Sequence, residues 1–219
     1  MTAADVRQFW HERWAQQQIG FHEGKPNELL AAHVDRLERA GHRLRILVPL
    51  AGKAVDLWWL AARGHQVVGI ELVRQAIDAF FSERGLEPRA EALGAHQSFA
   101  ASGVTMVCGD FFTQDAALLG PFDALYDRAA LIAIEPSMRA AYVEKCRSLL
   151  KRDADTLLVS VAYDQSKAPG PPWSVDEPTV RALFAGRAID VLARRAAEPN
   201  PRLAAAGVTA FDETAYLVR

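Results

Sequence analysis

Residues 44–71 read LRILVPLAGKAVDLWWLAARGHQVVGIE, and this stretch decides the fold class of the chain. Residues 44–50 are apolar and rich in branched side chains, and they run into a turn that contains Gly52, as a buried central strand does. An apolar helical stretch follows, and QVVGI at 66–70 then predicts a second strand that ends at Glu71. A strand, a helix and a second strand in this order predict a parallel sheet in an α/β fold.

The remainder of the chain continues this alternation of short apolar runs with longer amphipathic ones, so we expect a doubly wound, mostly parallel sheet. Residues 86–103 are weakly patterned, and we expect a loop or a small irregular hairpin there. The other predicted elements are helices at 72–81, 136–150 and 180–184, strands at 104–108, 122–126 and 156–163, and a closing antiparallel pair at 189–192 and 210–217.

Composition and charge limit the class of protein. The chain has 219 residues, of which 50% are hydrophobic and 24% are charged, a balance typical of a soluble globular domain. We expect a single domain, with a helical N-terminal segment at 1–43 and the sheet-containing core at 44–219. The net charge is −2 and no long run carries one sign, which argues against nucleic acid as a partner.

Other sequence features bear on location and on metals. The N-terminus lacks the pattern of a signal peptide, and no apolar run is long enough to span a bilayer, so we expect a cytoplasmic protein without a membrane partner. Cys108 and Cys146 are too few for a disulfide framework or a zinc site, and we expect buried thiols. The histidines show no metal-ligand spacing, so no metal site is predicted. Without an exposed amphipathic seam, we expect a monomer.

Ligands of an open parallel sheet bind beyond the carboxyl ends of its strands, and several informative residues fall there. Gly52 lets a ligand approach the turn after the first strand, and Glu71 can accept hydrogen bonds from both hydroxyls of a ribose. Asp110 and Phe111 follow the third strand, where they can meet an adenine amino group and stack on its ring. Each has a structural alternative, because an acid at a strand end also caps helices and a phenylalanine packs in cores.

The phosphate-binding loops of other nucleotide sites are missing from the sequence. The turn at Gly52 lacks the G-x-G-x-x-G pattern, which argues against a nicotinamide oxidoreductase. It is not a P-loop either, because Leu47 stands in place of the first glycine and Ala54 in place of the Ser or Thr that holds magnesium. An adenosyl ligand without a phosphate chain remains, and S-adenosylmethionine is the commonest of these.

The N-terminal segment carries large aromatic side chains ahead of the first strand, among them Phe9, Trp10, Trp14 and Phe21. Burial against the sheet is one interpretation. The other is a lid, because a sulfonium cation is attracted to aromatic faces and an aromatic lid excludes water and binds a flat substrate. The sequence leaves both interpretations open.

Several short motifs follow one another along the chain: FWHERW at 9–14, IGFH at 19–22, VPLAGK at 48–53, GH at 64–65 with VGIE at 68–71, YDRAAL at 126–131, and YD at 163–164 with GPP at 170–172. Together they closely resemble the thiopurine S-methyltransferase family, from about Trp10 to the end of the chain. The resemblance implies a class I, Rossmann-like methyltransferase fold that uses S-adenosylmethionine and releases S-adenosylhomocysteine. It also implies methylation of an aromatic or heterocyclic thiol, and some bacterial members methylate selenium or tellurium compounds.

The resemblance assigns roles to residues of this chain. Its cofactor-binding residues fall on Trp10, Trp14, Leu50, Gly52, Glu71, Asp110, Phe111 and Arg128. Its substrate-binding residues fall on Phe21, Arg128, Pro172, Trp173 and Arg202, and Arg128 is also the catalytic residue. Two residues depart from the family pattern, because Ala51 replaces the usual Cys and Trp173 replaces the Phe of several members. The first change should matter little to the chemistry, whereas the second changes a residue of the substrate pocket.

Methyl transfer from a sulfonium is an in-line displacement, so the protein must mainly align two reactants and exclude water. The resemblance then implies that Arg128 and Arg202 favour the thiolate form of the acceptor, without a metal or a dedicated base. Taken alone, Asp127-Arg128 would equally fit a surface ion pair. Two rival functions remain: a halide or thiocyanate methyltransferase with the same fold and cofactor, and an adenosyl-binding module without catalysis.

Overall fold

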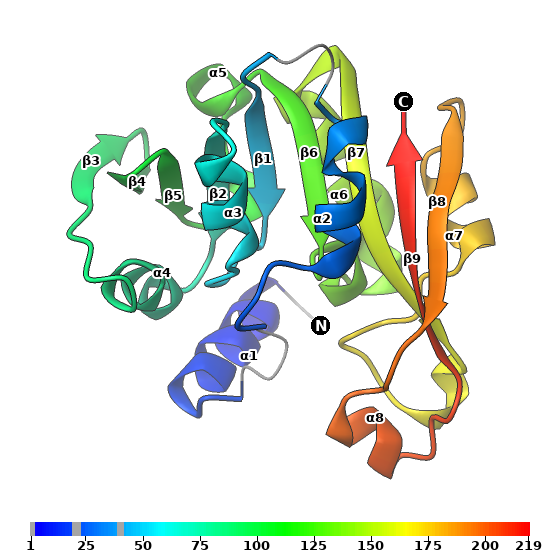
Figure 1. Cartoon of the computed structure of the whole chain (residues 1–219). Coiled ribbons are helices and arrows are strands. Elements are labelled where there is room, and N and C mark those ends of the chain that lie inside the picture. Colours follow the sequence, from blue (N-terminus) through cyan, green and yellow to red (C-terminus); the bar gives the residue numbers. More distant parts are fainter. Residues whose placement is uncertain (1–2, 19–22, 39–41) are drawn as a thin grey trace. The chain divides into compact units, whose positions relative to one another are not determined.

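The computed structural model describes residues 3–18, 23–38 and 42–219, which form strands with intervening helices (Figure 1). The pairs β1–β2, β2–β5 and β6–β7 are parallel, which confirms the predicted α/β class and the mostly parallel centre. No helix within these described ranges combines the length and the apolar character needed to cross a membrane.

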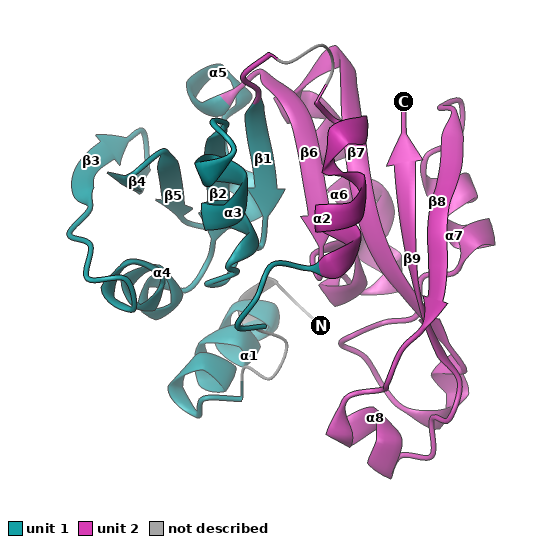
Figure 2. Ribbon diagram, viewed as in Figure 1, with its two compact units in different colours: residues 1–27, 45–119 teal, residues 28–44, 120–219 magenta. Residues whose placement is uncertain are grey.

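The chain forms two compact units, which Figure 2 shows in different colours. Unit 1 consists of Met1–Asn27 and Arg45–Leu119, and unit 2 consists of Glu28–Leu44 and Gly120–Arg219. Neither unit is one continuous piece of chain. Each combines an early segment with a later one.

The strands of unit 1 follow the order β3-β4-β5-β2-β1. Strands β1, β2 and β5 are mostly buried because their residues are apolar on both faces, as expected of parallel strands covered by helices. The strands of this unit are β1 (Arg45–Pro49), β2 (Gln66–Glu71), β3 (Arg89–Leu93), β4 (His96–Ala101) and β5 (Val104–Cys108). Its helices are α1 (Ala3–Ala15), α3 (Asp56–Ala62), α4 (Arg74–Ser82), α5 (Ala116–Leu119) and the 3-10 turn η3 (Phe111–Thr113).

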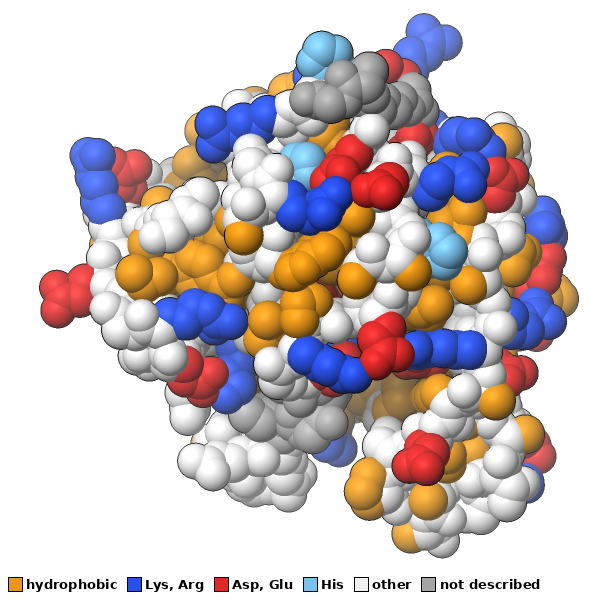
Figure 3. Space-filling model, viewed as in Figure 1, with side chains coloured by type: hydrophobic (Ala, Val, Ile, Leu, Met, Phe, Trp, Pro, Cys, Tyr) orange, Lys and Arg blue, Asp and Glu red, His pale blue; other side chains and the backbone are white. Residues whose placement is uncertain are grey.

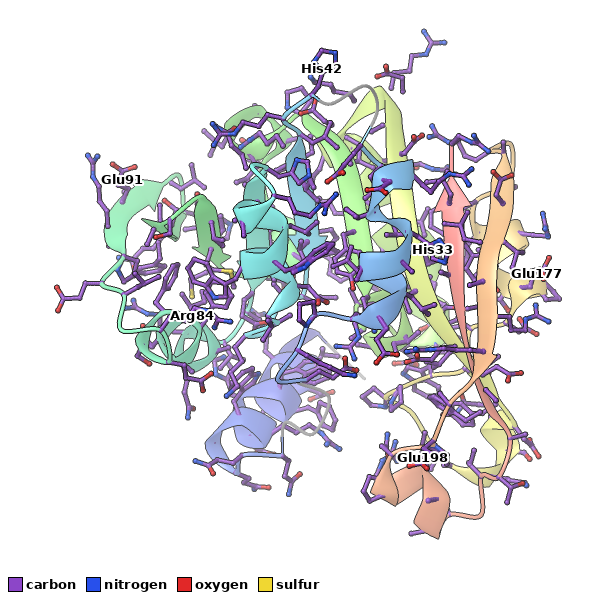
Figure 4. The ribbon with its side chains drawn as sticks, viewed as in Figure 1. His33, His42, Arg84, Glu91, Glu177 and Glu198 are labelled. Carbon is purple, nitrogen blue, oxygen red and sulfur yellow. The ribbon has the colours of Figure 1, made fainter. Side chains whose placement is uncertain are left out.

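Aromatic side chains join α3 and α4, two consecutive helices of unit 1. Trp58 of α3 stacks on Phe80 of α4, with ring centroids 4.5 Å apart and planes 7° from parallel. Its other close partners are Phe81, in an edge arrangement at 5.7 Å, and Arg84, whose guanidinium lies 5.2 Å from the indole (Figure 4). Stacked pairs of this kind contribute roughly 0.5–1.5 kcal/mol beyond the area they bury. The apolar run seen in the sequence therefore packs one helix on the next.

The stretch at 86–103 is more regular than the sequence indicates. Strands β3 and β4 form an antiparallel hairpin with an unbroken register, and β4 pairs in turn with β5. Most hairpin side chains are exposed, and Phe99 is the buried member of β4, with the guanidinium of Arg74 at 4.1 Å from its ring. A hairpin that buries so little has almost no hydrophobic alternation, which is why its pattern could not be read from the sequence.

The strands of unit 2 follow the order β6-β7-β9-β8, with β9 antiparallel to both neighbours, which confirms the predicted C-terminal pair. Helices α2 and α6 both pack against β7, and Figure 1 shows α2 in front of this strand and α6 behind it. The strands are β6 (Phe122–Arg128), β7 (Leu150–Tyr163), β8 (Ile189–Ala196) and β9 (Phe211–Val218). The helices are α2 (Glu28–His33), α6 (Arg139–Leu149), α7 (Glu177–Leu183) and α8 (Pro201–Ala205), with 3-10 turns η1 (Val34–Arg36), η4 (Leu131–Ala133), η5 (Pro136–Met138) and η6 (Gln165–Lys167).

Three strands of unit 2 are longer than predicted, among them β8, which continues past residue 192 to Ala196. β6 continues past residue 126 through Asp127 to Arg128, and β7 begins at Leu150 rather than at residue 156. In each case polar or charged residues belong to the strand, so a search for apolar runs misses them.

On the face seen in Figure 3, basic and acidic side chains lie interspersed.

Candidate active site

The turn after β1 is tied to the end of β2 by Glu71. Beyond Pro49 the backbone passes through Leu50 and Gly52, whose φ angles of 49° and 53° are left-handed. The Oε2 atom of Glu71 accepts a hydrogen bond from Gly52 N at 2.8 Å, and its Oε1 atom accepts one from Val73 N at 2.7 Å. The structure therefore brings together the glycine and the acid that the sequence analysis placed at one site.

The carboxylate of Glu71 is buried, with 7% of the residue exposed. Burial raises the pKa of this carboxyl, and the backbone hydrogen bonds from Val73 and Gly52 partly oppose that rise. An ionised carboxylate offers about four acceptor sites, so capacity for ligand hydroxyls remains beyond the backbone bonds. The structural alternative, a cap on the following helix, is not observed: α4 has no side-chain cap at Val73, and Glu71 bonds the N–H of Val73 itself, one residue ahead of the helix. Glu71 thus shapes the turn, and its contact with a ribose stays a prediction.

The aromatic N-terminal segment packs beside this acid. Trp14 of α1 is buried in a cluster with Val73 and Ala76, and Trp10 and Leu72 pack against the same cluster while partly exposed. The expected burial is therefore observed for Trp14, although its partners lie at the start of α4 rather than on the sheet. Because Leu72 and Val73 directly follow Glu71 in the chain, α1 borders the loop that leaves the acid.

Asp110 and Phe111 lie directly after β5, at the 3-10 turn η3. Asp110 caps this turn, since its Oδ1 accepts a hydrogen bond from Phe112 N at 2.9 Å. Phe111 is buried, at 2% exposure, whereas Phe112 is partly exposed, and their rings meet edge to face at 6.0 Å. The structural alternatives of the sequence analysis are thus both observed, and the contacts of Asp110 and Phe111 with an adenine stay a prediction.

In unit 2, the end of β6 is organised around a buried acid. Asp127 is 1% exposed, and it accepts hydrogen bonds from Leu131 N at 3.0 Å and from the hydroxyl of Tyr142 at 2.7 Å. Burial raises the pKa of Asp127 to about 6, although these two bonds lower it in part. The surface ion pair considered for Asp127-Arg128 is therefore wrong, because the carboxylate lies inside the protein. Arg128 ends the strand, and Ala129 turns the chain with a left-handed φ of 65°.

The proline-rich loop of unit 2 is held by Arg202. This side chain comes from α8, and its two Nη atoms donate to the carbonyls of Pro169 at 2.9 Å and Pro171 at 2.6 Å. Both acceptors are neutral, so these bonds fix the guanidinium without cancelling its charge. Trp173 is attached to the turn after β6, since its backbone N–H donates to the carbonyl of Ile132 at 2.6 Å. The structure therefore joins the predicted residues Arg202 and Trp173 through one loop.

Two residues that the sequence analysis did not single out complete this loop. The Tyr163 hydroxyl donates to the carbonyl of Pro172 at 2.7 Å, and Gln165 donates to that hydroxyl at 3.0 Å. Gln165 also accepts from Ser174 N at 2.7 Å. The sequence held one sign that Tyr163 matters, because this residue belongs to the YD motif at 163–164. Gln165 has none, because its role depends on contacts made only in the folded chain.

Three further expectations concern single residues or metals. Phe21 lies outside the described residues. Cys146 is buried as expected, whereas Cys108 is only partly buried, because β5 ends there. Among the residues that the structure describes, no group of three or more His, Cys, Asp and Glu side chains could hold a metal ion.

Comparisons with known proteins show the family of the chain. The sequence model of the family described as Thiopurine S-methyltransferase (TPMT) matches residues 6–219. The thiopurine S-methyltransferase of Pseudomonas fluorescens (strain SBW25) is 43% identical over 210 residues, which cover 95% of this chain and 96% of that protein.

Solved structures share the fold at lower identity. The magnesium protoporphyrin IX methyltransferase of Synechocystis PCC 6803, solved with bound S-adenosylhomocysteine, is 16% identical with a TM-score of 0.64 and full coverage of both chains, 100% each. The 1,6-didemethyltoxoflavin-N1-methyltransferase of Burkholderia thailandensis is 16% identical with a TM-score of 0.63, covering 99% of this chain and 88% of that one. The chain therefore has the class I methyltransferase fold and belongs to the thiopurine S-methyltransferase family of enzymes.

Proposed function

We propose that the chain transfers a methyl group from S-adenosylmethionine to the sulfur of an aromatic or heterocyclic thiol. The observation that carries the proposal is the 2.8 Å hydrogen bond from Gly52 N to Glu71 Oε2, which joins the turn after β1 to the acid at the end of β2. This is the arrangement in which α/β folds bind an adenosyl group. Family membership supports the reaction type, and the same resemblance brings selenium and tellurium compounds into the proposal as further acceptors.

The cofactor side of the proposal rests on unit 1. Glu71 would accept hydrogen bonds from the ribose hydroxyls with the acceptor capacity that its backbone bonds leave. Leu50 and Gly52 would bring the backbone of the turn to the ligand, because Gly52 has no side chain to obstruct it. Trp10 and Trp14 would offer aromatic faces to the sulfonium end. Asp110 and Phe111 would meet the adenine, and Arg128 is the further residue that the family resemblance assigns to the cofactor.

The acceptor side rests on residues of unit 2 and on Phe21. Arg202, Pro172 and Trp173 belong to the loop that the Arg202 guanidinium holds, and its charge is bonded only to neutral carbonyls there. An arginine in this state favours the negatively charged form of a nearby thiol. Arg128 is proposed to share this task as the catalytic residue. The thiolate is the competent nucleophile, and a heterocyclic thiol gives up its proton to water without a dedicated base.

When bound, S-adenosylmethionine supplies a methyl group on a sulfonium, which the acceptor sulfur displaces in line. The protein then has two tasks, to align the reactants and to exclude water. The loop of Arg202 and Trp173 and the cluster around Trp14 are the rigid elements available for these tasks, because each is fixed by several contacts. Preorganised charge of this kind needs no rearrangement during the reaction.

The first experiment measures binding of S-adenosylhomocysteine by calorimetry to the wild type and to Glu71→Ala. We expect the variant to bind at least about tenfold more weakly, a loss of about 1.4 kcal/mol, because hydrogen bonds to the ribose are lost. Glu91→Ala is the matched control, since Glu91 is an exposed glutamate of the same unit (Figure 4) and should leave binding unchanged. Circular dichroism of each variant reports whether the overall secondary structure is retained.

Acceptor assays then separate the rival functions. Turnover of 6-mercaptopurine supports the proposal, and selenite tests the wider acceptor range. Faster turnover of iodide than of any thiol would identify a halide methyltransferase. Tight cofactor binding without turnover of any acceptor would identify a binding module, and absence of binding to the wild type would overturn the adenosyl site itself.

A further inference from the structure

Unit 2 contains a cavity of about 190 Å³ that belongs to neither side of the proposed reaction. Its floor is apolar and comes from separate elements: Leu125 of β6, Val143 of α6, Phe184 after α7 and Val218 of β9, all of them buried. A cavity of this size is smaller than the roughly 300–1,000 Å³ typical of sites for drug-sized ligands. It therefore fits only a small apolar group.

The mouth of this cavity is basic. Arg147, Lys151, Arg152 and Arg187 line it, and no acidic side chain of the described residues does. Lys151 pairs with Asp123 at 2.5 Å and Arg147 pairs with Glu144 at 3.9 Å, and neither acid lines the cavity. Arg152 has no ion-pair partner among the side chains that the structure describes. Positive charge thus exceeds negative charge around an apolar floor.

An irregularity in β7 builds this mouth. Phe122 of β6 pairs with Leu150, but Ala124 pairs with Asp155, so β7 contains extra residues between the two pairs. This bulge turns Arg152 and its neighbours out of the ladder, as bulges generally do. The guanidinium of Arg187 fixes it by donating to the carbonyl of Arg152 at 3.3 Å and to that of Ala154 at 2.8 Å. Because both acceptors are neutral, the charge of Arg187 stays available.

The cavity also lies at the opposite end of the strands from the residues of the proposed reaction. β6 and β7 are parallel, and the cavity borders Leu150 at the start of β7. Arg128 and Tyr163 stand at the carboxyl ends of the same two strands. A ligand of this cavity would therefore be separate from the methyl acceptor.

A second cavity of unit 2, of about 500 Å³, shows how different the charge balance can be. Glu177 of α7 (Figure 4) pairs there with Arg181 and with Arg194, at 2.8 Å in each case. Asp176 and Asp212 also line it. Arg181 and Arg194 are thus neutralised by an acid within the protein, whereas Arg152 and Arg187 of the smaller cavity form no ion pair with the described side chains.

We propose that the smaller cavity binds a compact amphipathic anion, a carboxylate carried on a short aliphatic or aromatic body. The apolar body would fill the space over Leu125 and Phe184, which removes its surface from water. The carboxylate would remain at the mouth, where the planar guanidinium of Arg152 matches the geometry of a carboxylate.

Hexanoate is the probe that tests this site, with hexylamine and hexanol as controls for the tail and acetate as the control for the head group. The titration follows backbone amide shifts of the full-length protein in the presence of saturating S-adenosylhomocysteine. We expect saturable shifts at Val143, Ala154 and Phe184 with hexanoate, and none that saturate with the three controls. Added salt should weaken binding because the mouth is exposed to solvent.

Paired variants test the charge at the mouth. Lys151→Gln combined with Arg152→Gln should raise the Kd of hexanoate about tenfold, which corresponds to about 1.4 kcal/mol. Arg181→Gln, an exposed arginine of the same unit that does not line this cavity, should leave the Kd unchanged. Lys151 and Arg152 are both exposed, so the double variant should retain the fold.

Three outcomes would overturn the proposal: no saturable binding of hexanoate at millimolar concentration, equal binding of hexanol or hexylamine, or shifts confined to residues around Arg128 and Tyr163. An unchanged Kd in the double variant would equally remove the basis for an anion site. None of these results depends on whether the methyltransferase activity is present.

Discussion

Asp127 illustrates how one buried side chain determines the shape of a site. Its two oxygens accept from Leu131 N and from the Tyr142 hydroxyl, so the carboxylate ties the turn after β6 to helix α6. Arg128 stands between the strand and this turn. The position of Arg128, the proposed catalytic residue, therefore depends on Asp127, which is not itself proposed to contact the substrate.

Removing the Tyr142 hydroxyl should therefore destabilise the protein. Tyr142→Phe leaves a buried carboxylate without one of its donors, and the expected loss is about 1–3 kcal/mol of unfolding free energy. Urea denaturation measures it. Tyr216→Phe is the matched control, because Tyr216 is also buried, at 1% exposure, and its hydroxyl makes no hydrogen bond with the residues that the structure describes. Equal losses in the two variants would contradict a specific role for the bond to Asp127.

The raised pKa of Asp127 also predicts how stability depends on pH. The folded-state pKa is about 6, whereas an unfolded aspartate titrates near about 3.9. Between these values the folded state binds more protons than the unfolded state, so the contribution of Asp127 is present below about pH 4 and is lost as pH rises through about 6. The loss is roughly 3 kcal/mol. Unfolding free energies of wild type and Asp127→Asn, compared from pH 4 to pH 7, should diverge by this amount, whereas parallel curves would rule it out.

At the scale of an element, the loop from Pro169 to Trp173 is packed against its own glycine. A Cβ atom added at Gly170 would lie 2.2 Å from the indole of Trp173. Gly170→Ala must therefore displace the ring, and we expect a higher KM for the thiol acceptor with unchanged affinity for S-adenosylhomocysteine. Steady-state kinetics and calorimetry together measure both. Gly24→Ala is the control, because a Cβ there meets nothing within 4 Å; a KM change of the same size in it would remove the explanation.

The elements that could be predicted from the sequence are those that bury a continuous apolar run. β2 and β5 have the predicted bounds, because hydrophobicity alone marks both ends. The hairpin of β3 and β4 could not be found in this way, since Phe99 is the buried member of β4. The sequence pattern ends β6 two residues too early, because Asp127 is polar although it lies in the core.

The same distinction applies to the candidate site. Gly52 and Glu71 could be predicted because their strands, and hence their meeting point, follow from local pattern. The bonds of Arg202 to the carbonyls of Pro169 and Pro171 join segments more than thirty residues apart, as their separations of 33 and 31 residues show. Backbone carbonyls carry no sequence signal, so only the resemblance pointed to Arg202, and nothing pointed to Gln165.

At the scale of the whole molecule, the two units are interleaved along the chain. Residues 28–44 precede most of unit 1 but belong to unit 2. Within them, Leu29, Leu30 and Val34 are buried, and α2 packs against β7. A single cooperative domain, a monomeric state and a cytoplasmic location all stay predictions for this chain.

This connectivity predicts the behaviour of a fragment. Residues 1–119 contain all of unit 1, but they also carry Leu29, Leu30 and Val34 without the strand that α2 packs on. We expect the fragment to bind a hydrophobic dye and to associate in sedimentation experiments, because these side chains become exposed. The same fragment with all three residues replaced by Ser should associate less. A monomeric wild-type fragment that binds no dye would contradict this view.

The bulge that Arg187 fixes in β7 has a consequence for evolution as well. A strand with surplus residues between two fixed pairing points can lose, gain or exchange side chains there while the ladder on either side keeps its register. Selection can therefore alter the mouth of the smaller cavity from one lineage to the next without disturbing Arg128 at the far end of the neighbouring strand. Members of the family would in this way have room to acquire different preferences for the small carboxylate that we propose this cavity binds.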